Sequence, residues 1–207
     1  MVNIIARYLI MSDLTLFGDS PFFASTLAVA VAEIGDKTQL LSLILVARFN
    51  NRLAIIAGIL LATVINHGLS AWAGQWLGQT LDQFLTGSTL NWILAISFLL
   101  MAAWVLIPDK EDDETASYRR WGALVATTVL FFLAEIGDKT QVATVLLAAE
   151  FQDVLWVTVG TTCGMLLANV PVVIWGNALM KRLPLHIARY STSVIFVALA
   201  LWALLSQ

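Results

Sequence analysis

Six long apolar stretches, separated by short polar ones, dominate the pattern of hydrophobic and polar positions along the chain. They lie near residues 22–47, 53–77, 90–107, 122–149, 154–180 and 187–205. An apolar run of about 20 residues is long enough to cross the hydrocarbon core of a bilayer as an α-helix. The third and sixth stretches are near the minimum length for this. The pattern predicts an all-α integral membrane protein with six transmembrane helices.

Composition agrees with a membrane-embedded chain. Hydrophobic residues make up 59% of the 207 positions and charged residues 12%, whereas a soluble domain carries about 25% charged residues. The net charge of −3 is modest and no basic patch indicates a nucleic-acid partner. The single cysteine, Cys163, cannot form an intrachain disulfide, and neither zinc-ligand spacing nor an HExxH-type pattern occurs. We therefore expect the lipid bilayer as a partner, and neither nucleic-acid binding nor enzyme activity.

The loop lysines and arginines fall almost entirely on one side of the predicted membrane. That side carries Arg48, Arg52, Lys110, Arg119, Arg120, Lys181, Arg182 and Arg189. The other side carries only Arg7. Because loops rich in Lys and Arg stay in the cytoplasm, we predict that both termini lie on the non-cytoplasmic side. The acidic segment 108–120 is then a cytoplasmic linker, and residues 1–20 are an interfacial lead-in to the first span.

One seven-residue stretch occurs twice. Glu-Ile-Gly-Asp-Lys-Thr-Gln stands at 33–39 and again, unchanged, at 135–141, and the two halves align without a gap at an offset of 102. The match continues more weakly in the following spans, where Gly74 aligns with Gly176. We interpret the chain as an internal duplication in which the best-preserved stretch is also the most costly one to bury.

The number of spans in each half fixes the orientation of the two copies. Residues 1–107 form the first repeat and residues 121–207 the second, each with three predicted spans. Because three is odd, the second copy enters the membrane from the opposite side, which predicts an inverted repeat. Inverted repeats are typical of secondary transporters, whose substrate site lies near the bilayer midplane where the repeats meet.

Each motif places three ionisable groups within an apolar segment. A charge at the bilayer centre costs roughly 2.5–3.5 kcal/mol on insertion scales, so such groups are usually partnered and functional. On a continuous helix, Glu33 and Asp36 share a face, as do Glu135 and Asp138. If the two spans cross at their motifs, these four carboxylates converge, and they cannot all stay ionised without a nearby cation.

The other motif residues refine the predicted chemistry. Lys37 and Lys139 leave the four carboxylates with a formal charge of −2, which a divalent cation would balance, although protons could also neutralise the cluster. Further oxygen donors in the motifs are Thr38, Thr140, Gln39 and Gln141. Oxygen ligands suit Ca²⁺, Mg²⁺ or Mn²⁺ better than softer metals. The motifs therefore predict a site for a hard divalent cation.

Several supporting roles stay open from the sequence. Gly35 and Gly137 could permit a local helix break, or they could allow close helix packing. Asn66 and Asn169, in the second span of each repeat, could reach the site or form helix–helix hydrogen bonds. His67, which aligns with Asn169, is a further candidate ligand on the same grounds.

Alternatively, the motif could form an internal ion pair and bind no cation. Glu33 and Lys37 are four residues apart, as are their repeats, and such a pair would stabilise a buried helix. It leaves Asp36 and Asp138 without a role. The lysines could alternatively extend toward opposite membrane surfaces.

The duplicated motif resembles that of a known family. Two copies of Glu-x-Gly-Asp-(Lys/Arg)-(Thr/Ser), each in the first span of a three-span repeat, resemble the Gdt-one family, which looks related to the cation/Ca²⁺ exchanger superfamily. The resemblance covers residues 21–205, and both motifs match in full. The compact form resembles bacterial or cyanobacterial members, which implies a bacterial inner membrane or a thylakoid membrane.

The resemblance also implies a function. It implies transport of Mn²⁺, and of Ca²⁺ as a further candidate, out of the cytoplasm in exchange for protons by alternating access, with no tightly bound cofactor. The implied cation ligands are Glu33, Asp36, Glu135 and Asp138, with Gln39 and Gln141 as helpers. The competing interpretations are a divalent-cation channel or uniporter and a non-transporting membrane scaffold.

Overall fold

The computed structural model describes residues 20–107, 122–176 and 185–205, and every regular element in these ranges is an α-helix. The first half contains α2 (Pro21–Ala32), α3 (Lys37–Phe49), α4 (Arg52–Phe84) and α5 (Gly87–Val105). The second half contains α6 (Ala123–Glu135), α7 (Lys139–Phe151), α8 (Val154–Trp175) and α10 (Leu185–Leu205). The all-α class is confirmed for this part of the chain. The predicted linker at 108–120 and residues 1–19 of the predicted lead-in lie outside the described residues.

Among the described residues, three helices are long and apolar enough to cross a membrane. They are α4, α5 and α8, with 33, 19 and 22 residues. Shorter apolar helices are α2, α6 and the Arg189–Leu205 part of α10. A membrane-type helical architecture is therefore observed, while the count of six spans stays a prediction.

The first and fourth apolar stretches are each broken into two helices at their motifs. α2 ends before Glu33 and α3 begins at Lys37, and α6 and α7 are separated in the same way. Gly35 and Gly137 have φ angles of 82° and 76°, in a region that costs other residues roughly 1–2 kcal/mol. Of the two roles left open for these glycines, the helix break is the one observed.

Two other boundaries differ from the hydropathy pattern. α4 continues to Phe84 rather than stopping near residue 77: its last turns are polar and include Gly78, yet they stay helical until the backbone becomes extended at Leu85. α8 stops at Trp175 rather than near residue 180, because Gly176 takes a φ of 62°. Apolar content therefore located the helices, and local backbone chemistry set their ends.

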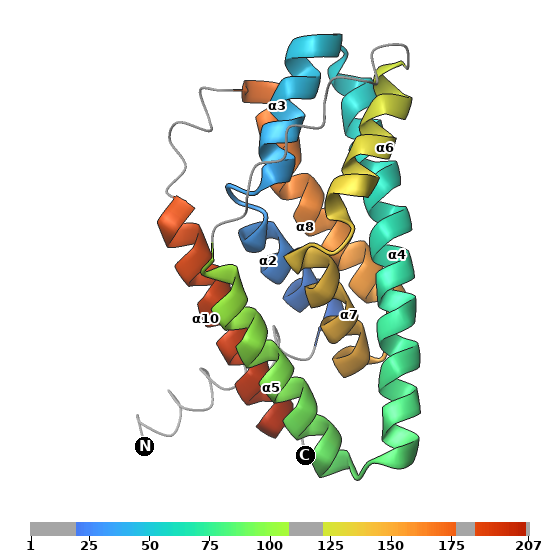
Figure 1. The fold of residues 1–207 in the computed structure, drawn as a ribbon, viewed down its shortest axis with the longest axis vertical. Helices are drawn as coiled ribbons and strands as arrows, with labels where there is room; N and C mark the ends of the chain where they lie inside the picture. The colour runs from blue at the N-terminus through green and yellow to red at the C-terminus, as the bar shows by residue number, and fades with distance from the viewer. Residues whose placement is uncertain (1–19, 108–121, 177–184, 206–207) are drawn as a thin grey trace, which may run out of the picture.

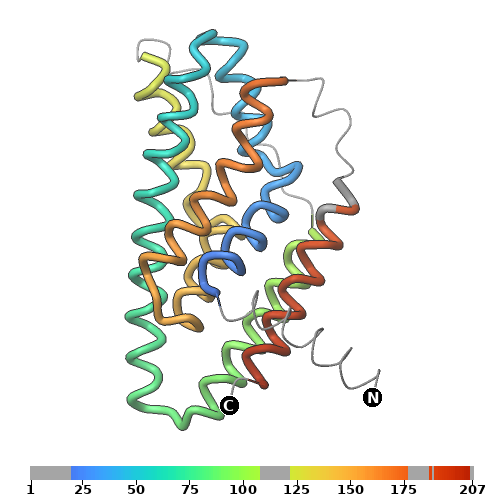
Figure 2. Tube along the Cα trace, turned by 180° about the vertical axis from the view of Figure 1, so that it is seen from behind, coloured from blue at the N-terminus to red at the C-terminus, as the bar shows by residue number. Residues whose placement is uncertain are grey.

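The two broken helices run in opposite directions through the centre of the bundle. In Figure 1, α2 and α3 rise from bottom to top, whereas α6 and α7 descend. α8 packs along α2, and α4 packs along both α6 and α7. α5 and α10 pair with each other and contact α7 and α2, respectively, so this pair crosses the lower half of the molecule, as the view from behind in Figure 2 also shows.

Glycines set the closest approaches between these helices. A Cβ at Gly58 of α4 would lie 2.9 Å from the carbonyl oxygen of Leu124 in α6. A Cβ at the equivalent Gly160 of α8 would lie 2.6 Å from the carbonyl oxygen of Phe22 in α2. Small residues at helix interfaces allow this close packing in membranes. The broken helices are therefore held tightly by the second helix of the opposite half.

Candidate metal centre

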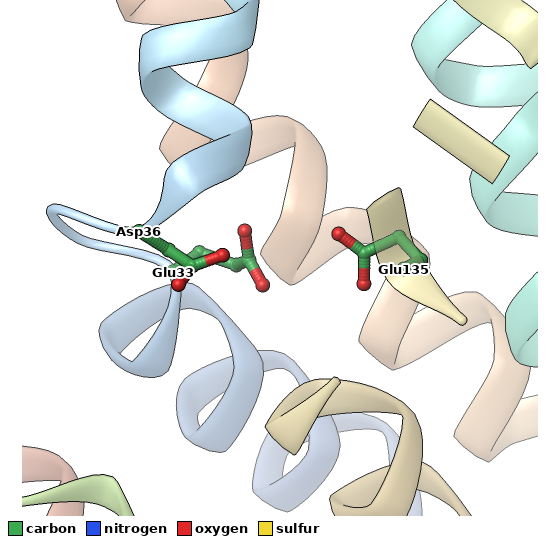
Figure 3. Close-up of side chains that lie close together, drawn as sticks. All are labelled: Glu33, Asp36 and Glu135. Carbon is green, nitrogen blue, oxygen red and sulfur yellow. The ribbon is translucent and has the colours of Figure 1, made fainter. Parts of the chain in front are cut away.

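Three carboxylates meet where the two helix breaks face each other. One oxygen atom from each of Glu33, Asp36 and Glu135 lies within 4.8 Å of the others, and all three residues are buried. Figure 3 shows Glu33 and Asp36, from the junction of α2 and α3, facing Glu135 at the end of α6. The sequence argument placed Glu33 and Asp36 on one helical face. They converge instead because the break separates them, with Glu33 closing α2 and Asp36 capping α3.

Each glutamate is held in the same way within its motif. The Thr38 hydroxyl donates to Glu33 Oε2 at 2.6 Å, and the Thr140 hydroxyl donates to Glu135 Oε2 at 2.9 Å. The other oxygen of each glutamate, Oε1, is buried without a hydrogen-bond partner among the described residues. Because an unsatisfied buried carboxylate oxygen is costly, both atoms are suited to receive a cation or a proton.

Asp138 lies beside this trio but is bound differently. Its Oδ2 lies 3.2 Å from Lys37 Nζ, and its Oδ1 accepts a hydrogen bond from its neighbour's backbone N–H. The lysine of the first motif thus pairs with the aspartate of the second, and an internal Glu33–Lys37 pair is not what the structure contains. Lys139 Nζ instead donates to the carbonyl oxygen of Ile107 at 2.6 Å. Lysines that are identical in sequence therefore have different partners.

The two glutamines stabilise the helix breaks. Gln39 Oε1 accepts from the Gly35 N–H at 2.8 Å, and Gln141 Oε1 accepts from the Gly137 N–H at 2.6 Å. Their amide groups donate across the interface, Gln39 to the Ala168 carbonyl oxygen and Gln141 to a side chain of α4. An amide oxygen has a second lone pair, so a role for either glutamine at the cation stays a prediction.

The second helices contribute polar side chains around the site. Asn66 Oδ1 accepts from Gln141 Nε2 at 2.5 Å. Asn169 Oδ1 accepts from the Ser42 hydroxyl at 3.1 Å, and Asn169 Nδ2 donates to the Met165 carbonyl oxygen at 3.2 Å. Helix–helix hydrogen bonding is thus observed for both asparagines, and a role in the ion pathway stays a prediction. Sequence reasoning missed Ser42, since a lone serine in an apolar span carries no distinguishing signal.

The donors in this centre suit a hard cation. Carboxylate oxygens dominate the site, and the surrounding groups are hydroxyls and amides. Ca²⁺, Mg²⁺ and Mn²⁺ prefer such oxygen ligands. Discontinuous helices that meet at a buried ion site are a recurring feature of secondary transporters.

A bundle of apolar helices around a buried carboxylate centre defines an ion-transporting membrane protein. The chain belongs to the family of the divalent cation/proton antiporter GDT1, whose family model matches residues 21–113 and 123–207. The match includes both motifs and all helices of the described structure.

Relatives are found in bacteria and plants. A Vibrio cholerae protein provisionally named a manganese exporter is 52% identical over 178 residues, which cover 86% of each chain. A GDT1-like protein of Synechocystis is 28% identical over 78% of this chain and 85% of its own length. The GDT1-like protein 4 of Oryza sativa subsp. indica is 28% identical over 78% of this chain and 65% of its own. No solved structure matches the chain.

Proposed function

We propose that this protein exports Mn²⁺ from the cytoplasm in exchange for protons, at a site formed by Glu33, Asp36, Glu135 and Asp138. The observation that carries the proposal is the buried carboxylate trio at the two helix breaks, in a chain of the divalent cation/proton antiporter family. The name of the Vibrio cholerae relative supports Mn²⁺ as the cargo. Ca²⁺ is a second candidate cargo because the same oxygen ligands suit it.

Competition between metal and protons accounts for the exchange. Carboxylates ligate a cation only when deprotonated, so metal binding releases protons and protonation releases metal. Glu33 and Glu135 each keep one buried oxygen without a hydrogen-bond partner among the described residues. Several negative charges packed together are stable only when a cation or protons neutralise them. The same carboxylates can thus carry Mn²⁺ outward and protons inward.

Alternating access is supported by an asymmetry between two equivalent helix contacts. A Cβ at Gly74 of α4 would overlap the carbonyl oxygen of Val145 in α7. At the equivalent position Gly176, which follows α8 with a φ of 62°, the nearest atom among the described residues is Leu43 Cδ2 of α3, 3.9 Å from the Cβ position. We infer that the halves form an inverted repeat that is closed between α4 and α7 and more open between α8 and α3.

The inferred orientation assigns these contacts to the two sides of the membrane. Arg48 and Arg52 flank the turn between α3 and α4, at the top of Figure 1. Since loops rich in Lys and Arg stay in the cytoplasm, the open α8–α3 contact faces the cytoplasm. The conformation then corresponds to a cytoplasm-facing state in a bacterial inner membrane or a thylakoid membrane, with both termini on the far side.

Ion flux into proteoliposomes tests the proposal. An imposed pH gradient should drive Mn²⁺ movement with reciprocal proton flow, and Glu135→Gln should abolish both. Glu150→Gln is the matched control, because Glu150 lies in the same half of the chain, on α7, outside the trio.

Other outcomes would favour the competing functions. Mn²⁺ movement without proton counter-flow would indicate a channel or uniporter. Folded protein that moves neither Mn²⁺ nor Ca²⁺ would contradict transport and favour a scaffold.

A further inference from the structure

His67 is a buried side chain with no role in the site as described above. It lies in α4 with no solvent-exposed surface, and neither ring nitrogen has a hydrogen-bond partner among the described residues. Its Nε2 lies 4.0 Å from Glu135 Oε2. Buried polar atoms are nearly always hydrogen-bonded, so an unsatisfied imidazole beside a carboxylate centre needs an explanation.

The equivalent position in the second half shows what a purely structural residue does here. Asn169 occupies that position and is fully bonded, accepting from Ser42 and donating to the Met165 carbonyl oxygen. The position equivalent to Ser42 is Thr144. Its hydroxyl donates to the Thr140 carbonyl oxygen of the same helix. In the second half, the amide of Asn169 therefore has its hydrogen bonds filled. In the first half, the imidazole of His67 has no hydrogen-bond partner among the described residues.

We propose that His67 supplies a nitrogen ligand to the cation held by Glu33, Asp36 and Glu135, and so favours a transition metal over Ca²⁺ or Mg²⁺. This inference rests on the proposed function, because it assumes that the carboxylate trio binds the transported cation. It assigns His67 a role that its counterpart Asn169 does not share.

The distances are compatible with shared coordination. Two ligand atoms on one octahedral cation, each about 2.1 Å from it, lie about 3.0 Å apart when adjacent and about 4.2 Å apart when opposite. The 4.0 Å between His67 Nε2 and Glu135 Oε2 falls within this range. His67 adjoins the trio through Glu135 but is not part of the group whose ligand atoms all lie within 4.8 Å of one another, so coordination requires the imidazole to move toward Glu33 and Asp36 when the cation binds.

A nitrogen ligand changes which cations the site prefers. Ca²⁺ and Mg²⁺ are bound almost entirely by oxygen, whereas imidazole is a good ligand for first-row transition metals. Mn²⁺ binds nitrogen least strongly of that series, so the expected gain is moderate. We expect His67→Asn to reduce the preference for Mn²⁺ over Ca²⁺ by about tenfold, comparable with the loss of one supporting interaction at a metal site.

Pulsed electron paramagnetic resonance of Mn²⁺ bound to the purified full-length protein tests the inference directly. Nuclear modulation from the ¹⁴N of a coordinated imidazole is expected in the wild-type protein and should be absent in His67→Asn. The matched control is His186→Asn, because His186 is the only other histidine of the chain and its removal should leave the modulation unchanged. A competition assay between Mn²⁺ and Ca²⁺ should show the tenfold loss of preference in His67→Asn alone.

The outcomes separate this inference from the proposed function. Wild-type protein that binds Mn²⁺ without nitrogen modulation would overturn the role of His67 and leave the carboxylate site intact. Wild-type protein that binds no Mn²⁺ would contradict both. If His67→Asn fails to fold, the wild type and His186→Asn together still decide the question, because modulation that persists without His186 leaves only the imidazole of His67.

Discussion

The two copies of the motif have the same sequence and the same local fold but different surroundings. In each copy the threonine hydroxyl donates to the glutamate and the glutamine oxygen accepts from the glycine N–H. The lysines differ, because Lys37 pairs with Asp138 whereas Lys139 donates to the Ile107 carbonyl oxygen. Local sequence therefore determines the helix break, and the packing of the two halves determines the partners of the charges.

The helices that pack around the two motifs also differ between the halves. α4 is packed against α7 at Gly74, while the equivalent contact at Gly176 is looser. His67 stands where the other half has Asn169. The proposed alternating-access mechanism would reverse the first difference during transport, whereas the second is a difference of sequence and is permanent.

The largest effect on Mn²⁺ flux is expected at the glutamates, which both motifs contribute to the trio. Glu33→Gln and Glu135→Gln each remove a charged oxygen from the trio. Supporting groups at metal sites cost about 10–100-fold when removed, so loss of a ligand should lower Mn²⁺ flux by more than about 100-fold. Flux into proteoliposomes measures this, with Glu150→Gln as the control that should retain activity. Equal flux in all three variants would show that the trio does not take part in transport.

A large effect on stability is expected at the closed helix contact. Gly74→Ala places a methyl group against the backbone of Val145 and should destabilise the protein by about 3 kcal/mol, the upper end of the range for overpacking. Gly68→Ala, on the same helix, meets only Thr158 Cγ2 at 3.8 Å and should stabilise it by about 0.5–1 kcal/mol. Thermal unfolding in detergent measures both. Similar values for the two variants would contradict the close packing of α4 and α7.

A moderate effect is expected from the unequal lysines. Lys37→Gln removes the ion pair of Asp138, which frees a fourth carboxylate for the cation and should tighten Mn²⁺ binding about tenfold. Lys139→Gln should have a smaller effect on Mn²⁺ binding, because it leaves the ion pair between Lys37 and Asp138 in place. Equilibrium binding of Mn²⁺ to purified protein compares them. Equal changes would mean that the two lysines are equivalent in solution.

The smallest effect is expected from the glutamines that stabilise the breaks. Gln39→Ala and Gln141→Ala each leave a glycine N–H without its acceptor and should cost about 1 kcal/mol. The two losses should be similar, because each variant removes one bond to a glycine N–H and one bond that the amide donates across the interface. Gln79→Ala, at an exposed position of α4, is the control and should change the unfolding temperature little. A loss confined to one motif would show that the two breaks are not stabilised in the same way.

Much of the architecture could be predicted from the sequence because apolar length and the duplicated motif are local signals. The predicted apolar stretches are helical within the described residues, although two of them are broken, and three of the four carboxylates expected to converge, Glu33, Asp36 and Glu135, come together. The helix break was left open because a glycine permits a positive φ without requiring it. Gly35 adopts it together with a specific acceptor, Gln39 Oε1, four residues later.

The partners of the charges could not be predicted because they depend on how the halves cross. Lys37 can reach Glu33 along a continuous helix, but the break turns it toward Asp138 of the opposite half. The bond between Lys139 and the Ile107 carbonyl oxygen depends on α5 packing against α7. Neither contact leaves a trace in sequence spacing.

The most direct test of the central claim is proton release when Mn²⁺ binds. Mn²⁺ would be added to purified protein in weak buffer while a pH indicator records the protons set free. Exchange at these carboxylates predicts proton release that rises with bound Mn²⁺ and is lost in the Glu33→Gln/Glu135→Gln double variant. Mn²⁺ binding without proton release, or release unchanged in the double variant, would contradict exchange of metal and protons at these carboxylates.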